Sequence, residues 1–416
     1  MDSAWGHPRS GPDSIVLGAS GSDASVGWTP VTQPIPYLNA RLQGFTSTIF
    51  SEMSTLATAT GSLNLGQGFP DADGPDVVIR GAIRAIEAGY NQYPPLSGIV
   101  ELRSAIARHQ RRHRGIDVDI ESEILVTAGA TEALAACCLS LCEPGDEVIT
   151  FEPFYDAYAA SIALAGARHR VVPLHAPDWT FDPADVEAVV TDRSRMILVN
   201  TPHNPTGKVF SRVELEVIAD VCRRHDLLAV TDEVYEHLVY ESAHVSLATL
   251  PAMAQRTITI SSAAKTFSVT GWKVGWVCAP AELIAAIRAA KQFLTYVNAG
   301  PFQYAVAEGL DHCDEYLVEA ARVLRGKRDL LAAGLTAAGF DVLDSPGTFF
   351  LTTDISAVTN EDAETFCRHL PHRCGVVAIP SSVFYDDRDR GRHFVRWMFS
   401  KRVDVLEDAV ERLSRL

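Results

Sequence analysis

The feature that most constrains the fold is an alternation of short apolar segments and amphipathic segments between residues 124 and 277. The segment 195–200 is apolar through its centre, as expected of a strand buried on both faces. Such alternation predicts a mainly parallel β-sheet covered by helices, which is an α/β fold. We expect strands at 124–127, 147–150, 195–200, 227–231, 257–261 and 273–277, and helices at 132–141, 156–165 and 212–225.

The pattern changes near residue 300, where we place a second, smaller α+β domain. The predicted organisation is a flexible tail at 1–27, a segment at 28–60 that packs on the small domain, a large domain at 61–300 and the small domain at 301–416. In the small domain we expect one long helix at 301–328 leading into 329–338, strands at 347–351 and 394–398, and a final helix at 404–416.

Composition limits the classes of partner. Hydrophobic residues make up 47% of the chain and charged residues 21%, the balance of an ordinary globular protein. The formal net charge of −16 argues against nucleic acid or an anionic membrane as the main partner, since both need clustered cations. A local pocket can still bind an anionic substrate. The N-terminus lacks the basic and apolar regions of a secretory signal, so we expect a cytoplasmic protein.

The eight cysteines give no sign of a metal site or a disulfide framework. None lies in a CxxC pair, and the chain has no HExxH helix motif. We therefore expect reduced core thiols and no metal.

Polar residues gather where three of the predicted strands end. The segment 200–204 follows one strand, Asp232 follows another, and the segment 262–265 follows a third. Open α/β sheets bind their ligands at the carboxyl ends of parallel strands. The sequence therefore predicts a site at this edge.

Lys265 and Asp232 together suggest the chemistry of that site. A lone lysine in this position could simply be a surface residue that extends its amine into water. An acid at the end of an apolar strand, however, needs a cationic partner if it is buried. A pyridoxal cofactor meets both needs, because the amine of Lys265 can condense with its aldehyde while Asp232 keeps the pyridine nitrogen protonated.

Three motifs carry a resemblance to a known family. They are SSAAKTFSVTGWKVGW at 261–276, NTPHNPTG at 200–207 and TDEVY at 231–235. This set resembles class I/II aminotransferases of pyridoxal-phosphate (PLP) fold type I, over nearly everything except the tail. The segments LGQGFPD at 65–71, NQY at 91–93 and EPFYD at 152–156 are similar to the branch that contains N-succinyldiaminopimelate, kynurenine/glutamine and methionine aminotransferases.

The resemblance implies roles around the cofactor ring. Lys265 would form the Schiff base, with Asp232 behind the pyridine nitrogen. Asn204 and Tyr235 would hydrogen-bond the phenolate oxygen, and Tyr155 would stack on the ring face.

It also implies a binding site for the cofactor phosphate. The backbone amides of Ala130 and Thr131 would point at the phosphate from a helix start, with Ser262 and Lys273 adding a hydroxyl and a charge. Thr131 could instead be only a helix N-cap. Tyr93 would reach the phosphate of a neighbouring subunit, which implies a homodimer.

On the substrate side, Arg396 stands in an otherwise apolar strand, where an unpaired guanidinium would be costly. Its planar fork suits the substrate α-carboxylate, although a structural salt bridge with an acid of the chain is the alternative. Gly68 would let the backbone approach the same carboxylate, and Asn204 would also lie beside the substrate.

The activity implied is ping-pong transamination between an L-amino acid and a 2-oxo acid. The donor would be N-succinyl-LL-2,6-diaminoheptanedioate or an aromatic, methionine or glutamine-type amino acid. A PLP-dependent C–S β-lyase, or another PLP reaction such as a cyclase, oxidase or synthase, is the alternative on the same fold. A non-catalytic binding module would be expected to have lost Lys265, which is present.

Overall fold

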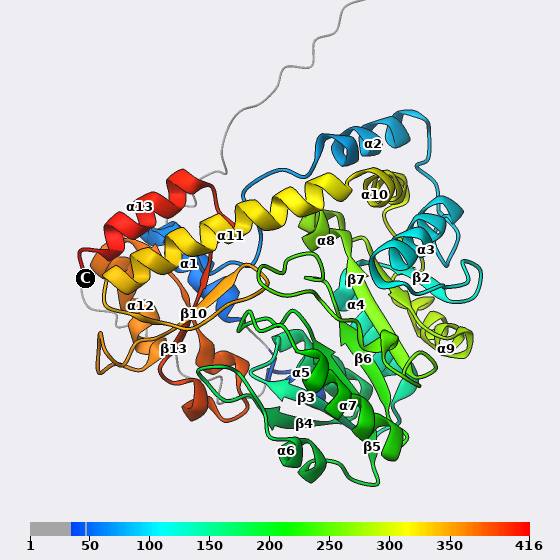
Figure 1. Ribbon diagram of the computed structural model, residues 1–416, viewed down its shortest axis with the longest axis horizontal. Coiled ribbons are helices and arrows are strands. Elements are labelled where there is room, and N and C mark those ends of the chain that lie inside the picture. The colour runs from blue at the N-terminus through cyan, green and yellow to red at the C-terminus, as the bar shows by residue number, and fades with distance from the viewer. Residues whose placement is uncertain (1–34, 46–47) are drawn as a thin grey trace, which may run out of the picture. The chain divides into compact units, whose positions relative to one another are not determined.

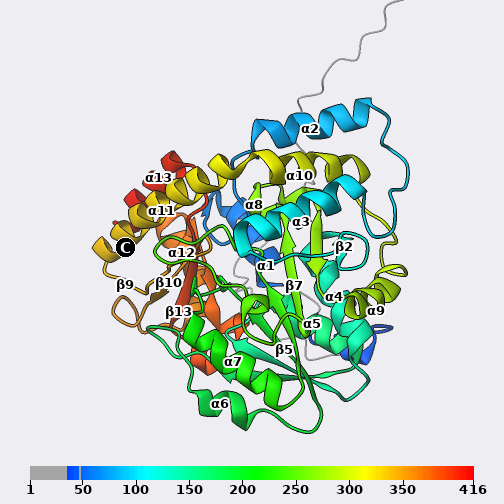
Figure 2. The same ribbon diagram turned by 45° about the vertical axis from the view of Figure 1, so that its right-hand side comes forward.

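A computed structural model describes residues 35–45 and 48–416, and residues 40–416 of it form one compact unit that contains every element below. The predicted tail at 1–27 lies outside the described residues, as does the beginning of the 28–60 segment. Figure 1 and Figure 2 show this unit in two orientations.

The unit is built on a seven-stranded sheet in the order β2-β8-β7-β6-β5-β3-β4. β8 runs antiparallel to both of its neighbours, and the other pairs are parallel. The prediction of an α/β fold with a mainly parallel central sheet is therefore confirmed. The strands are β2 (Ile124–Thr127), β3 (Glu147–Glu152), β4 (Arg168–Pro173), β5 (Ser194–Asn200), β6 (Leu228–Asp232), β7 (Thr257–Ser262) and β8 (Gly275–Cys278).

Successive side chains of these strands enter different cores, because a strand alternates its faces. In β5, Met196 and Leu198 join the core under α4, α5 and α9, whereas Ile197 and Val199 join the core under α6 and α7. In β2, Ile124 and Val126 pack towards α3 and α10. Helices therefore cover both faces of the sheet. They are α2 (Asp76–Glu87), α3 (Val100–Arg114), α4 (Gly129–Leu141), α5 (Asp156–Ala165), α6 (Pro183–Ala188), α7 (Arg212–Arg224), α8 (Ala263–Thr266), α9 (Ala281–Lys291) and α10 (Gly300–His312).

A second, four-stranded antiparallel sheet has the order β12-β13-β10-β9, and its core also contains residues of α1. A two-stranded parallel sheet pairs β1 with β11. Figure 1 shows α11 running from α10 towards α13 beside this second sheet. The remaining elements are α1 (Ile49–Thr60), β1 (Leu63–Asn64), α11 (Asp314–Ala337), β9 (Asp341–Val342), β10 (Phe350–Asp354), α12 (Ala363–Cys374), β11 (Val376–Val377), β12 (Ile379–Pro380), β13 (Phe394–Met398) and α13 (Val403–Leu413). The domain boundaries drawn from the sequence stay predictions.

Three element predictions were wrong in detail, each for a backbone reason. The expected single helix at 301–328 is two helices, because Cys313 leaves helical geometry with ψ at 26°. The strand expected at 347–351 begins only at Phe350, because Thr348 has a φ of +66°, which a strand does not accommodate. The strand expected at 273–277 begins at Gly275, because Lys273 is left-handed with a φ of +53°.

Two further observations concern the whole described chain. All eight cysteines are free thiols, and most are buried, as predicted. Among the described residues, no helix combines the length and the apolar composition that crossing a membrane requires.

The packing of α11 on α13 gives a test of this fold. A Cβ atom at Gly334 would lie 2.3 Å from Cγ2 of Val410, so this glycine lets the two helices approach. We expect Gly334→Ala to lower the free energy of unfolding by about 1–3 kcal/mol through overpacking. On the same helix, a Cβ atom at Gly326 would have nothing within 4 Å. Gly326→Ala should therefore raise the free energy of unfolding by about 0.5–1 kcal/mol. Urea unfolding measures both variants, and equal shifts would contradict this packing.

Candidate active site

One cavity of about 380 Å³ gathers most of the residues singled out in the sequence. Its lining is drawn from the seven-stranded and four-stranded sheets and from the segments that follow β1, β2, β3, β5, β6 and β7. The predicted site residues that line it are Gly68, Ala130, Thr131, Tyr155, Asn204, Asp232, Tyr235, Ser262, Lys265, Lys273 and Arg396. Tyr93 does not line it.

Lys265 lies in α8, the short helix that directly follows β7. Its Nζ donates to the carbonyl oxygen of Gly68 at 3.0 Å and lies 5.7 Å from the ring centroid of Tyr235. Burial lowers the pKa of Lys265 to about 8, and the charge of Arg396 contributes in the same direction. Lys265 is therefore not a solvated surface lysine, and its neutral amine is accessible near neutral pH.

Asp232 ends β6 and is almost completely buried. Its Oδ2 accepts a hydrogen bond of 2.7 Å from the hydroxyl of Tyr158, and its Oδ1 accepts a longer one of 3.3 Å from the amide of Val234. Burial raises the pKa of Asp232 to about 6, although the bond from Tyr158 and the charge of Lys265 act against this. A cation next to this buried carboxyl would stabilise its ionised form.

Two asparagines hold the loop that follows β5. The amide nitrogen of the Asn200 side chain donates to the carbonyl oxygen of Asp232 at 2.9 Å, which ties β5 to β6. The Oδ1 of Asn200 accepts from the backbone amide of Asn204 at 2.7 Å. Asn200 thereby fixes where Asn204 enters the cavity.

Arg396 lies in β13 with only 1% of its surface exposed. Its Nη1 donates to Oδ1 of Asn204 at 2.8 Å and its Nη2 to the carbonyl oxygen of Gly66 at 3.0 Å, both neutral acceptors. Among the described residues, its buried Nε has no hydrogen-bond partner, and no acid forms an ion pair with this guanidinium.

Aromatic rings hold the guanidinium in place. Its Cζ lies 4.0 Å from the ring centroid of Phe350, 5.0 Å from that of Phe384 and 5.1 Å from that of Phe50. Burial lowers the pKa of Arg396 to about 10, so the side chain remains charged at neutral pH. The result is a fixed cation that forms no ion pair with any acid in the described part of the chain.

The start of α4 forms one wall of the cavity. The helix begins at Gly129, and its N-cap is Ala128 rather than Thr131, so the reading of Thr131 as the N-cap was wrong. The amides of Ala130 and Thr131 therefore belong to the first turn, whose N–H groups lack partners within the helix. Lys273 lies against this turn, because a Cβ atom at Gly129 would be 3.3 Å from its Nζ. An amide-lined helix start beside a lysine is suited to an anion.

Tyr155, Tyr235 and Gly68 complete the set. Tyr155 precedes α5 and meets Tyr158 edge to face at 5.7 Å between ring centroids. Tyr235 is 3% exposed, and burial raises the pKa of its hydroxyl. Gly68 contributes its carbonyl oxygen to Lys265, and a Cβ atom there would be 3.3 Å from Phe350 Cζ.

Tyr93 differs from the other predicted residues, because it is 82% exposed. Its only ring contact among the described residues is an edge-to-face one with Tyr296 at 5.8 Å. Within a single chain it lies outside the site.

Several site residues escaped the sequence interpretation. Tyr158 stands three positions after Tyr155, and residues at this spacing share a helix face, so a signal existed. The anchoring role of Asn200 was also missed, although the strand end itself was predicted. Phe50 and Phe350 line the cavity without any motif that would identify them, and Gln67 was given no role although it lies in the LGQGFPD segment.

The described residues fit pyridoxal phosphate. The amine of Lys265 has a lowered pKa, Asp232 is an acid in need of a cation, and the first turn of α4 with Lys273 offers a phosphate site. The unpartnered Nε of Arg396 leaves capacity for a further anion. Each feature has the sign of charge that the cofactor or its substrate requires.

Comparison with known proteins agrees with this arrangement. The family model for aminotransferase class I and II matches residues 60–413. The chain is 51% identical over 389 residues to a protein named probable N-succinyldiaminopimelate aminotransferase DapC of Mycobacterium tuberculosis (strain CDC 1551 / Oshkosh), covering 91% of this chain and 98% of that protein. It is 39% identical over 378 residues to a methionine aminotransferase of Escherichia coli (strain K12), with 91% of this chain and 98% of that protein covered.

A solved structure extends the likeness to three dimensions. N-succinyldiaminopimelate aminotransferase from Mycobacterium tuberculosis superposes with a TM-score of 0.89 at 51% identity, covering 91% of this chain and 99% of that one. The family predicted from the sequence motifs is therefore confirmed. The chain belongs to the class I and II aminotransferases and is a PLP-dependent enzyme of fold type I that moves an amino group between an amino acid and a 2-oxo acid.

Proposed function

We propose that Lys265, Asp232 and Arg396 carry out this transfer, and that the amino donor is N-succinyldiaminopimelate. The observation that carries the first part is the convergence of the three side chains, from β6, α8 and β13, on one cavity. The donor is supported by the name and the 51% identity of the Mycobacterium tuberculosis relative.

The bound cofactor supplies an electron sink that makes the α-proton of an amino acid acidic. Asp232 would serve that sink by holding a proton on the pyridine nitrogen. Burial raises its pKa, and a protonated ring nitrogen would supply a cation that stabilises the ionised carboxylate. Tyr158 would keep the carboxylate directed at the ring through its 2.7 Å hydrogen bond.

Lys265 would take the proton from the α-carbon of the substrate and return it at another atom. This task needs a neutral amine near neutral pH, which the pKa of about 8 provides. The hydrogen bond to Gly68 is made to a neutral carbonyl oxygen, so the amine can leave it without separating an ion pair.

Arg396 would bind the α-carboxylate of the substrate. Its present partners, Asn204 and the carbonyl oxygen of Gly66, are neutral, so a carboxylate would supply the missing charge. The ring of Phe350 at 4.0 Å would keep the guanidinium plane in one orientation. Binding of the α-carboxylate by Arg396 would also orient the α-carbon of the substrate towards Lys265.

A donor panel tests the proposed substrate. We expect the holoenzyme to use N-succinyl-LL-2,6-diaminoheptanedioate with 2-oxoglutarate at a kcat/KM at least about tenfold above that for methionine, kynurenine or glutamine, a difference of about 1.4 kcal/mol in transition-state binding. The assay measures directly the 2-oxo acid formed from each donor and the glutamate formed from 2-oxoglutarate. A higher kcat/KM for methionine or kynurenine would overturn the donor assignment. If the enzyme releases pyruvate and a thiol from β-substituted cysteines faster than it transaminates these donors, the result would favour the lyase alternative.

The assignment of Lys265 is tested by covalent trapping. Borohydride reduction of the holoenzyme should add the mass of the reduced cofactor to the peptide that contains Lys265, because only an amine can link to the cofactor aldehyde. Lys265→Ala should lose this trapping and at least about 10³-fold in kcat/KM. Lys327→Ala is a matched control, since Lys327 is a half-buried lysine outside the cavity lining. Trapping that persists in Lys265→Ala would contradict the assignment.

We also propose a homodimer in which Tyr93 contributes to the partner's cofactor site. Tyr93 is 82% exposed and Phe293 84% exposed, while Tyr90 and Tyr296 are each about half exposed. Aromatic rings gathered on a surface are typical of interfaces, where they bury large apolar areas.

Subunit complementation tests the dimer. Lys265→Ala and Tyr93→Ala should each be nearly inactive alone, since each lacks one part of every site. Mixing and refolding the two variants should restore up to about a quarter of wild-type activity, because half of the assemblies are hybrids with one complete site. Recovery would be absent if Tyr93 served its own chain or if the protein were a monomer.

We further infer a cytoplasmic location. All eight cysteines are free, including the neighbours Cys137 and Cys138, and free thiols are typical of reducing compartments.

A further inference from the structure

Three histidines meet at a partly buried position outside the active-site cavity. His109 and His113 lie one turn apart on α3, and His237 follows β6. The ring centroids are 4.6 Å apart for His109 and His113, 4.9 Å for His109 and His237, and 5.0 Å for His113 and His237. The mechanism proposed above uses none of them.

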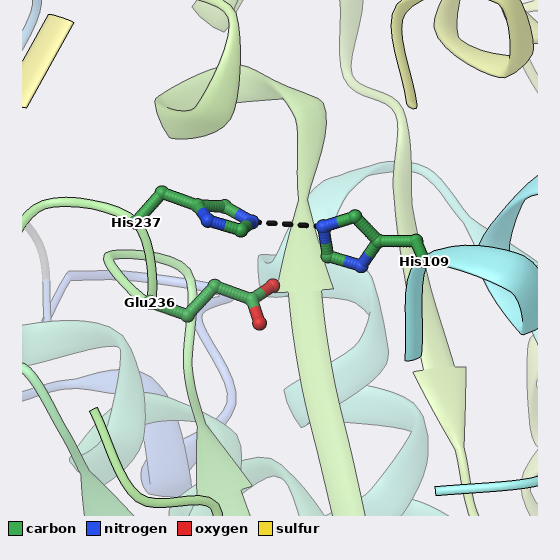
Figure 3. Close-up of side chains that lie close together, drawn as sticks. All are labelled: His109, Glu236 and His237. Atoms are coloured by element: carbon green, nitrogen blue, oxygen red, sulfur yellow. Dashed lines mark hydrogen bonds between the residues drawn. The ribbon is translucent and has the colours of Figure 1, made fainter. Parts of the chain in front are cut away.

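The closest approach within this histidine cluster is between two ring nitrogens. The Nε2 of His109 lies 2.8 Å from the Nε2 of His237, and Figure 3 shows the two rings pointing at one another with the Glu236 side chain beside them. One ring nitrogen of each of these two histidines and a carboxylate oxygen of Glu236 all lie within 4.8 Å of one another. Two imidazoles and one carboxylate therefore converge on one point.

Glu236 is held in position by two partners. Its Oε2 accepts from Nη2 of Arg114 at 2.7 Å, and its Oε1 accepts from the hydroxyl of Ser261 at 2.6 Å. The pKa of the Glu236 carboxyl is well below its usual range: burial opposes this, while the charge of Arg114 is the largest favourable cause. The carboxylate is thus ionised, and its Oε1 is bound only by a neutral group.

His109 and His237 are neutral. Burial lowers the pKa of His109 to about 4 and holds the pKa of His237 well below its usual value. Neutral imidazole is the form that binds metal ions, since a ring nitrogen then has a lone pair to give. The Nδ1 of His109 is buried without a hydrogen-bond partner, so the hydrogen-bond network leaves this ring incompletely satisfied.

We propose that His109, His237 and Glu236 form a binding site for a divalent transition cation of the zinc class. Two histidines and one carboxylate are a known ligand set for such cations. Ligands at about 2.0–2.1 Å in a tetrahedral arrangement stand roughly 3.3 Å apart. The two Nε2 atoms, now 2.8 Å apart, would need to separate by only a few tenths of an ångström.

His113 lies on the side through which a cation would enter. Its side chain is 24% exposed, and its Nε2 lies 3.2 Å from Oδ1 of Asp314, which is 45% exposed. An acid and an imidazole at the rim favour a cation's approach. Release from Asp314 would let His113 serve as the fourth ligand.

Two features limit the affinity of this site for a cation. Arg114 already compensates Glu236, so the bound cation would not be fully neutralised. Binding through Nε2 also requires the proton of neutral His109 to be on Nδ1, which has no hydrogen-bond partner among the described residues. We therefore expect a dissociation constant on the order of micromolar, which a strong chelator would reverse.

Zinc binding by the untagged holoenzyme tests this site. In competition with a chromophoric chelator, we expect one zinc site per chain whose dissociation constant rises at least about tenfold in His237→Gln and in His109→Gln. His175→Gln is the matched control, because His175 also lies close to an acid, Asp185 at 3.6 Å, but is 58% exposed and remote from the cluster in sequence. This variant should bind as the wild type does.

A second measurement does not depend on any variant folding correctly. Cobalt added to the wild-type holoenzyme should give the visible absorption of a nitrogen-ligated, low-coordinate ion, and equimolar zinc should remove it. The proposal is overturned if wild-type protein gives no such spectrum. It is equally overturned if His237→Gln and His109→Gln bind zinc as tightly as the wild type, because the cluster would then be only a hydrogen-bond network.

Discussion

The structure depends on a local excess of positive charge in the cavity. Lys265, Lys273 and Arg396 line the cavity, against Asp232 as the single acid among its described lining residues, although the chain as a whole carries −16. Burial lowers the pKa of Lys265 and Arg396 and raises that of Asp232, so it disfavours the charged form of each of these three groups. A phosphate and a carboxylate bound in this cavity would supply the missing negative charge. Global acidity and local anion binding are therefore compatible, because a few fixed cations at low dielectric outweigh distant surface acids.

Fixed charges of this kind need a rigid frame, and the central sheet provides it. The register pairs Asn200 with Asp232 and Asp232 with Ile260, so the ends of β5, β6 and β7 lie side by side. Asn200 fixes the position of the loop that follows β5, because its Oδ1 accepts a hydrogen bond from the backbone amide of Asn204. Arg396 comes from the four-stranded sheet. The Asn204 side chain joins it to the seven-stranded sheet, and the carbonyl oxygen of Gly66 joins it to the segment after β1. Any shift of the four-stranded sheet relative to the seven-stranded sheet would therefore change the distance between the guanidinium of Arg396 and Lys265.

The sequence predicted those parts of the site that follow from strand ends and strong motifs. Asp232, Asn204 and Lys265 follow apolar strands, and parallel topology alone brings such positions together. The roles of Tyr158 and Asn200 could not be assigned in this way, because they depend on which side-chain or backbone atoms these residues meet in other segments. The break at Cys313 and the late start of β10 arise from single backbone angles, which apolar periodicity does not report. The prediction of no metal site rested on spacing along the chain, whereas the histidine cluster joins residues more than a hundred positions apart.

The segment that follows β6 shows how neighbours decide what each acid can do. Asp232 faces the cavity with a neutral phenol as its closest donor, so it is free to hold an added cation. Glu233 is bonded to His244 and Ser246, both buried, and is therefore committed to the fold. Glu236 has Arg114 on one oxygen and only the hydroxyl of Ser261 on the other. Ser261 is followed directly by Ser262 of the cavity, and Glu236 directly follows Tyr235. A cation bound at the histidine cluster would thus act on the same strand ends that position the cofactor.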